Sequence, residues 1–100
     1  MNLVFKALAD ESRRGLLDRL HENNGQTLSE LCGHLDMTRQ AVTKHLHVLE
    51  GAGLVSSIRV GRESRFAYRP EPVGEARAYL DQVSAQWDDA LGRLRALVEG

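Results

Sequence analysis

The chain has 100 residues, of which 42% are hydrophobic and 27% charged, and this composition is that of one globular domain, expected to span residues 1–100. No apolar run approaches the roughly 20 residues that a membrane-spanning helix needs, so we expect no membrane partner. The amino-terminal residues lack a signal-peptide pattern, and the single cysteine suits a reducing compartment, which together predict a cytoplasmic protein.

The net charge of −1 is unevenly distributed along the chain. Residues 38–70 hold six basic residues against two glutamates, a local charge of +4, whereas residues 1–37 sum to −2 and residues 71–100 to −3. Because a phosphate backbone responds to local charge, the total charge does not argue against nucleic-acid binding. The middle of the chain is therefore the candidate nucleic-acid surface.

The first third of the chain predicts three short helices. Val4 and Phe5 mark the first, and Asp10 is a suitable N-cap for the second, which a polar loop over residues 21–26 follows. Residues 27–30, Thr-Leu-Ser-Glu, form a capping box that opens a third helix. A short break at residues 36–37 leads directly into a fourth helix. The succession of a helix, a short turn and a second capped helix is the spacing of a helix-turn-helix.

Residues 38–50 predict a recognition helix. Val42, Leu46 and Leu49 fall on one apolar stripe at about 100° per residue. The opposite side carries amide, hydroxyl, ammonium and imidazole groups, which hydrogen-bond base edges and phosphates, and Glu50 is its first carboxylate. A solvated face without acidic residues is the alternative for this helix alone. The candidate contacts to double-stranded DNA here are Thr38, Arg39, Gln40, Thr43, Lys44 and His47.

A basic hairpin is expected after the recognition helix. Gly53 supplies the left-handed residue that ends the helix. Strands are predicted over residues 55–60 and 65–69, joined by a turn over residues 61–64 with Arg62 at its tip. This hairpin is a candidate wing whose DNA contacts would be Arg59, Arg62 and Arg65.

Residues 73–98 predict one long helix. Val73, Leu80 and Trp87 recur every seven residues, and a second apolar set follows three residues after each. A helix of about 39 Å exceeds what the core of so small a domain can cover. The alternative is a helix that packs its stripe inside its own domain, but we favour a dimer seam. The expected dimer interface is Val4, Phe5, Leu80, Val83, Trp87, Leu91 and Leu94.

Several stretches in the same order resemble winged helix-turn-helix regulators of the ArsR/SmtB type. They are residues 7–14 (ALADESRR), 28–32 (LSELC), 40–49 and 52–55, together with the wing over residues 59–65. The resemblance implies a mainly α fold with five helices and a β-hairpin wing. It also implies a homodimer that binds a pseudo-palindromic operator, represses its own transcription, and is released by a metal or another signal.

The metal sites of that family match this chain poorly. Cys32 fits the family pattern on the third helix, but His34 stands where a second cysteine is usual, and residues two apart on a helix do not face each other. The family's other site needs histidine on the last helix, and residues 73–98 contain none. We therefore expect no metal and no cofactor, and an unidentified small-molecule or protein effector. A metal-responsive repressor using Cys32 and His34 is the alternative.

Other functional classes have less support in the sequence. There is no glycine-rich phosphate loop and no nucleophile arrangement in a suitable context, so we expect no enzyme. A protein-interaction module on a helix-turn-helix scaffold is a further alternative. The arginines of the predicted hairpin argue against it, because such a module has no need of a basic wing.

Overall fold

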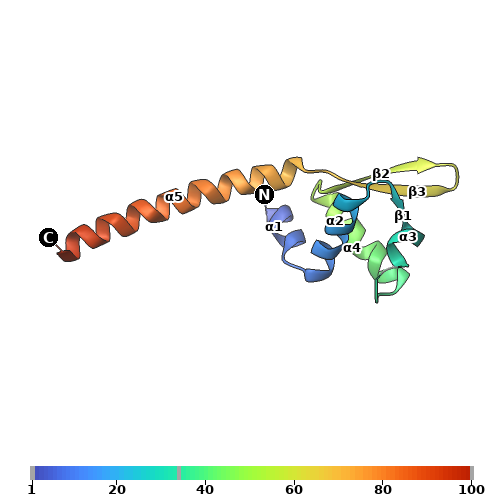
Figure 1. Cartoon of the computed structure of the whole chain (residues 1–100), viewed down its shortest axis with the longest axis horizontal. Coiled ribbons are helices and arrows are strands. Elements are labelled where there is room, and N and C mark those ends of the chain that lie inside the picture. The colour runs from blue at the N-terminus through green and yellow to red at the C-terminus, as the bar shows by residue number, and fades with distance from the viewer. Residues whose placement is uncertain (1, 34, 100) are drawn as a thin grey trace.

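The computed structural model describes residues 2–33 and 35–99, and shows a compact head from which one long helix projects (Figure 1). The elements described are α1 (Asn2–Leu8), α2 (Glu11–Glu22), β1 (Gln26–Thr27), α3 (Leu28–Cys32), α4 (Arg39–Gly51), β2 (Val55–Val60), β3 (Glu63–Tyr68) and α5 (Glu71–Glu99). The extents of 68 × 24 × 21 Å reflect the projecting helix. This is the predicted mainly α architecture of five helices and a hairpin within the described residues. None of the helices described combines the length and apolarity that crossing a bilayer requires.

Side-chain caps define where three helices of the head begin. Asp10 accepts a hydrogen bond of 3.2 Å from a backbone N–H of α2, and Thr27 and Thr38 do the same for α3 and α4 at 3.2 and 3.1 Å. The two threonine caps contribute about 1 kcal/mol each. The bond from the Arg13 N–H lowers the pKa of Asp10. The stabilisation by this cap is therefore complete at neutral pH and is lost as the pH falls through the lowered folded-state pKa.

The recognition helix α4 is held in the head by its apolar stripe. Val42, Leu46 and Leu49 are at most 1% exposed, which confirms the predicted orientation of the helix. The helix ends as expected, because Gly53 takes a φ of +76° and Leu54 donates back to the Leu49 carbonyl at 3.0 Å. The other fully buried large side chains of this core are Leu16, Leu20, Leu31 and Leu54.

The wing is longer and its turn tighter than predicted. β3 begins at Glu63, which pairs with Val60, so the turn consists of Gly61 and Arg62 alone. The predicted four-residue turn and the strand over 65–69 were wrong at these boundaries. Of the two turn residues only Gly61 has a positive φ, +65°, which matches the type II′ turn of two-residue hairpins. Because this turn is so short, strand pairing includes Glu63 and Ser64, which have low strand propensity.

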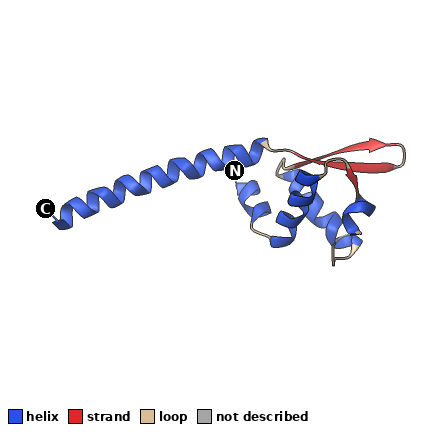
Figure 2. Ribbon diagram, in the orientation of Figure 1, coloured by secondary structure: helices blue, strands red, loops and turns tan. Residues whose placement is uncertain are grey.

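The segment predicted as a polar loop is partly ordered by the wing. β1 pairs antiparallel with β3, and the sheet order is β1-β3-β2 (Figure 2). Gln26 is 6% exposed, and its amide donates to the carbonyls of Arg19 and Asn23 at 2.9 and 2.8 Å, at the end of α2. The predicted polar loop over 21–26 was wrong at both ends, because α2 continues to Glu22 and Gln26 is buried in β1, where its amide satisfies helix-terminal carbonyls.

Only the first turns of α5 pack on the head. Ala76 is 4% exposed, Val73 packs against the core, and the rings of Phe5 and Tyr79 lie 6.1 Å apart. Beyond this point the large apolar side chains are uncovered, so the alternative that α5 buries its stripe within its own domain is wrong. Their exposed fractions run from 52% to 65% for Leu80, Trp87, Leu91 and Leu94.

Two residues expected at the dimer interface have partners in their own head. Val4 is 7% exposed and belongs to the core, and Phe5 is half-buried against it. Val4 faces the core of its own head from the short α1, so its place at a dimer interface stays a prediction. Val83 is also only partly exposed.

Candidate nucleic-acid interface

The exposed face of α4 carries the polar residues that the sequence predicts. Gln40, Lys44 and His47 are exposed and follow one another at spacings of four and three residues, so their side chains share one face of the helix. The buried stripe lies on the opposite side. This face combines an amide, an ammonium and an imidazole, which are complementary to base edges and phosphates.

Two further residues of α4 are engaged in local hydrogen bonds. Arg39 donates from Nη1 to Ser29 Oγ over 3.4 Å and thereby links α4 to α3. Thr43 donates from Oγ1 to the Arg39 carbonyl over 2.9 Å. Since its hydroxyl proton is used inside the helix, Thr43 is left to accept a hydrogen bond or to contact a thymine methyl. Ser29, which the sequence analysis missed, stands two residues after the Thr27 cap and is exposed beside this helix.

The pairing register separates the wing arginines onto different faces. Arg59 pairs with Ser64, two residues from the Ser57–Phe66 pair, and Phe66 is buried against the core. Arg59 therefore lies on the face of the hairpin that turns toward the helices, because side chains two apart on a strand share a face. Arg65 lies on the opposite face, and Arg62 is exposed in the turn.

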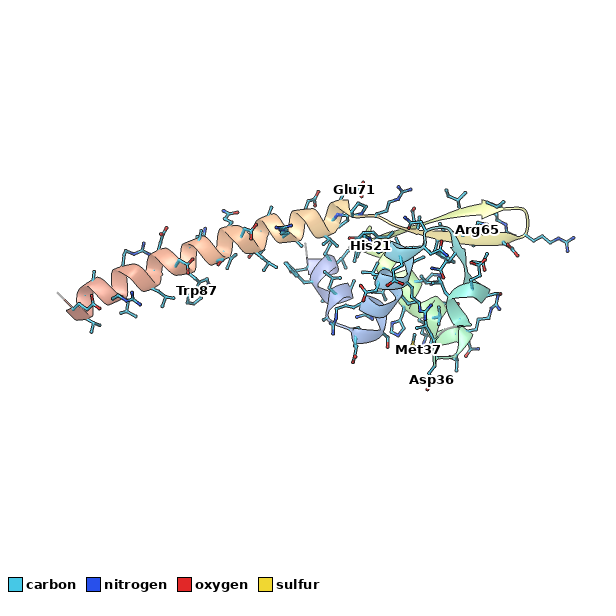
Figure 3. All side chains as sticks on the ribbon, in the orientation of Figure 1. His21, Asp36, Met37, Arg65, Glu71 and Trp87 are labelled. Carbon is cyan, nitrogen blue, oxygen red and sulfur yellow. The ribbon has the colours of Figure 1, made fainter. Side chains whose placement is uncertain are left out.

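Arg65 has partners within the protein. Its side chain lies on the wing (Figure 3). Its Nη1 donates to the Gly25 carbonyl over 3.0 Å, and its Nη2 lies 3.5 Å from Glu63 Oε2. Its side chain is 41% exposed. These contacts hold the loop before β1 against the wing, so the geometry gives Arg65 a structural role in addition to its basic charge.

A hollow of about 460 Å³ lies between the helix-turn-helix and the wing. Basic groups stand at its two sides, but carboxylates are also present, so its charge is mixed. The two arginines of the lining belong to the start of α4 and to the wing tip. Its charged and polar lining includes Arg39, Thr43, His47, Glu50, Arg62 and Glu63.

Of the two residues considered for metal binding, Cys32 and His34, the structure describes only Cys32. Cys32 is half-buried and packs against the core, and His34 lies outside the described residues. Within residues 2–33 and 35–99 no three His, Cys, Asp or Glu side chains gather as metal ligands would.

Comparison with known proteins agrees with this geometry. A helix-turn-helix domain family matches residues 8–58. The chain is 47% identical over 76 residues to the uncharacterized HTH-type transcriptional regulator YuzN of Bacillus subtilis, covering 70% of this chain and 83% of that protein. It is 34% identical over 62 residues to the transcriptional repressor SdpR of the same organism, covering 62% of this chain and 68% of that protein.

Among solved structures, an ArsR-like transcriptional regulator from Rhodococcus sp. RHA1 superposes with a TM-score of 0.92 at 36% identity, covering 98% of this chain and 89% of that chain. All three relatives are transcriptional regulators rather than enzymes. The wing, the capped α4 and these matches agree over the whole head, and the chain belongs to the ArsR family of winged helix-turn-helix transcriptional regulators.

Proposed function

We propose that this regulator is a repressor that binds an imperfect inverted repeat in double-stranded DNA as a homodimer. The observation that carries the proposal is the acid-poor exposed face of α4, with Gln40, Lys44 and His47 turned away from a fully buried stripe. Repression is supported by the similarity to SdpR, which is a transcriptional repressor. A cytoplasmic location follows from the DNA target.

The dimer is supported by the uncovered part of α5. Leu80, Trp87 and Leu94 repeat every seven residues and are all more than half exposed. A continuous apolar surface of this kind marks an association site in a water-exposed protein, and a second copy offers the matching seam. Two recognition helices then read half-sites about 34 Å apart, one turn of DNA.

The direct test is a footprint on the DNA upstream of the gene for this chain. We expect protection of two half-sites related by inverted symmetry, with affinity that falls steeply as salt is raised. A scrambled duplex of equal length is the control. Protection of one asymmetric half-site, or no binding at low salt, would contradict the proposal.

Gln40 is expected to read a base. It is exposed near the start of α4, where recognition helices reach base edges. Gln40→Ala should weaken binding to the preferred operator by about 1–3 kcal/mol and relax the preference at one symmetric base position. Binding of a panel of single-base operator variants measures this. An equal loss for every variant would assign Gln40 to the backbone instead.

Arg62 is expected to contact the DNA backbone or the minor groove from the wing tip. Arg62→Ala should weaken all sequences alike and lower the slope of log affinity against log salt by about one, because about one fewer counterion is released. Arg77→Ala, which removes an exposed arginine of α5, is the matched control and should leave the slope unchanged. A changed base preference in Arg62→Ala would show that this arginine reads sequence.

We expect the repressor to act without a transition metal. A closed tetrahedral zinc site requires four ligands, and this chain has a single cysteine and no histidine in α5. Adding zinc, nickel or cadmium to the reduced protein on its operator should not release the DNA. Stoichiometric release that Cys32→Ser abolishes would restore the metal-sensing alternative.

A further inference from the structure

Arg13 lies where α1, α2 and α4 meet, and its guanidinium is bound on several sides. Its Nε donates to the Ala7 carbonyl and its Nη2 to the Lys6 carbonyl, both over 2.9 Å. These carbonyls belong to the last turn of α1, where helix carbonyls need partners from outside the helix, and the Lys6 carbonyl also accepts a long bond of 3.3 Å from the Ala9 N–H. The third group, Nη1, lies 3.5 Å from Nδ1 of His45 on α4. The Arg13 side chain is only 17% exposed.

The contact with His45 adds a directional constraint to the recognition helix. His45 is half-buried and sits between the exposed Lys44 and the core residue Leu46. The apolar stripe holds α4 on the head and sets which face is buried, but the hydrophobic effect itself has no preferred direction, so a hydrogen bond at the edge of the stripe adds a directional restraint. A hydrogen bond at the edge of that stripe fixes the rotation of α4 relative to the end of α1.

We propose that Arg13 and His45 form a positioning pair that sets the angle of the recognition helix relative to the dimer side of the same subunit. The inference rests on the proposed dimeric binding to an inverted repeat. α1 lies against α5 through Phe5 and Tyr79, so Arg13 connects that side to α4. One subunit alone can shift as a body to accommodate a misdirected helix. Two subunits joined in a dimer cannot both shift, so the full operator is penalised more than a half-site.

The pair is sensitive to protonation of His45. A guanidinium has only donors, so His45 must accept at Nδ1 and carry its proton on Nε2. Protonated histidine has no acceptor, and the bond from Arg13 is then lost. The charged groups gathered here are Asp10, whose Oδ2 lies 3.9 Å from Arg13 Nη1, and Arg13 itself; Lys6 contributes its carbonyl. Asp10 offsets part of the repulsion between two cations but cannot restore the hydrogen bond.

The neighbouring Arg14 provides a matched control. Its Nη1 donates to the Leu8 carbonyl over 2.7 Å, so it also caps the end of α1. Among the described residues the Arg14 guanidinium forms no hydrogen bond with α4. Arg14→Ala therefore tests the loss of an α1 cap, whereas Arg13→Ala tests the same loss together with the link to His45.

The experiment measures affinity for a duplex with both half-sites and for one with a single half-site, together with dimer state and thermal unfolding. Arg13→Ala and His45→Leu should bind the full operator about five- to tenfold more weakly, within the range of a single ordinary hydrogen bond, and the half-site within about twofold of wild type. Arg14→Ala should show no such difference between the two duplexes.

His45→Asn keeps an acceptor at the Nδ1 position and cannot be protonated. It should therefore match wild type in its discrimination between the full operator and the half-site, whereas His45→Leu, which has no acceptor, should not. If Arg13→Ala fails to fold, the comparison of His45→Leu with His45→Asn decides alone.

Equal losses on both duplexes, or none, in a protein that binds its operator normally would overturn the positioning role while leaving the repressor function intact. Failure of the wild-type protein to distinguish the full operator from a half-site would instead refute the dimeric function itself.

Discussion

Trp87→Ala is expected to convert the dimer largely to monomer and to weaken operator binding with it. Trp87 is 65% exposed in the single chain and stands on the part of α5 that projects from the head (Figure 3). If a second copy covers it, truncation removes about 3–5 kcal/mol from the dimer, which is a hundredfold or more in its dissociation constant. Operator affinity falls because the two half-sites no longer bind as one unit.

Sedimentation velocity and operator binding over the same protein concentrations test this result. Gln86→Ala is the control, because Gln86 is the exposed neighbour of Trp87 and occupies neither of the two apolar positions, a and d, of the heptad. Thermal unfolding of the head should be unchanged in both variants at concentrations where each is monomeric. An unchanged dimer in Trp87→Ala would move the interface to another surface.

Leu46→Ala is expected to destabilise the head by about 2–5 kcal/mol, because Leu46 is 1% exposed and the cavity would open beneath the recognition helix. For a domain of this size each kcal/mol lowers the melting temperature by about 4–8 °C. DNA binding should be lost as the head melts, rather than by loss of a contact to DNA.

Val48→Ala is the matched control for Leu46→Ala. Val48 belongs to the same helix, but it is 42% exposed, so its truncation should change stability by less than about 0.5 kcal/mol. Urea unfolding of the two variants separates burial from helix propensity. Equal effects would mean that the stripe assigned to the core does not hold α4.

Much of the candidate site could be predicted because its signals are local. The Thr38 cap, the 3.6-residue spacing of Val42, Leu46 and Leu49, and the stop at Gly53 together specify a helix and its outward face. The wing signal was weaker at Glu63 and Ser64, whose low strand propensity concealed that they pair with β2.

The contribution of the sequence by itself was therefore the five helices and the hairpin, though not β1, together with the polar face of α4, the basic middle segment and the family to which their order belongs. Periodicity, capping and local charge depend on residues within a few positions of one another, so they can be identified in a single sequence without knowledge of the fold. The heptad repeat of α5 likewise indicated an apolar seam without showing which turns the head covers.

Only the tertiary structure decided which of these side chains are exposed and which are held by contacts within the protein. Charge counting grouped the wing arginines, but the strand register puts Arg59 and Arg65 on opposite faces and ties Arg65 to the Gly25 carbonyl. Val4 turned into the core, and Arg13 reached His45 across 32 positions of sequence. These outcomes depend on contacts between segments distant in the chain, where one residue of register or rotation exchanges a buried side chain for an exposed one.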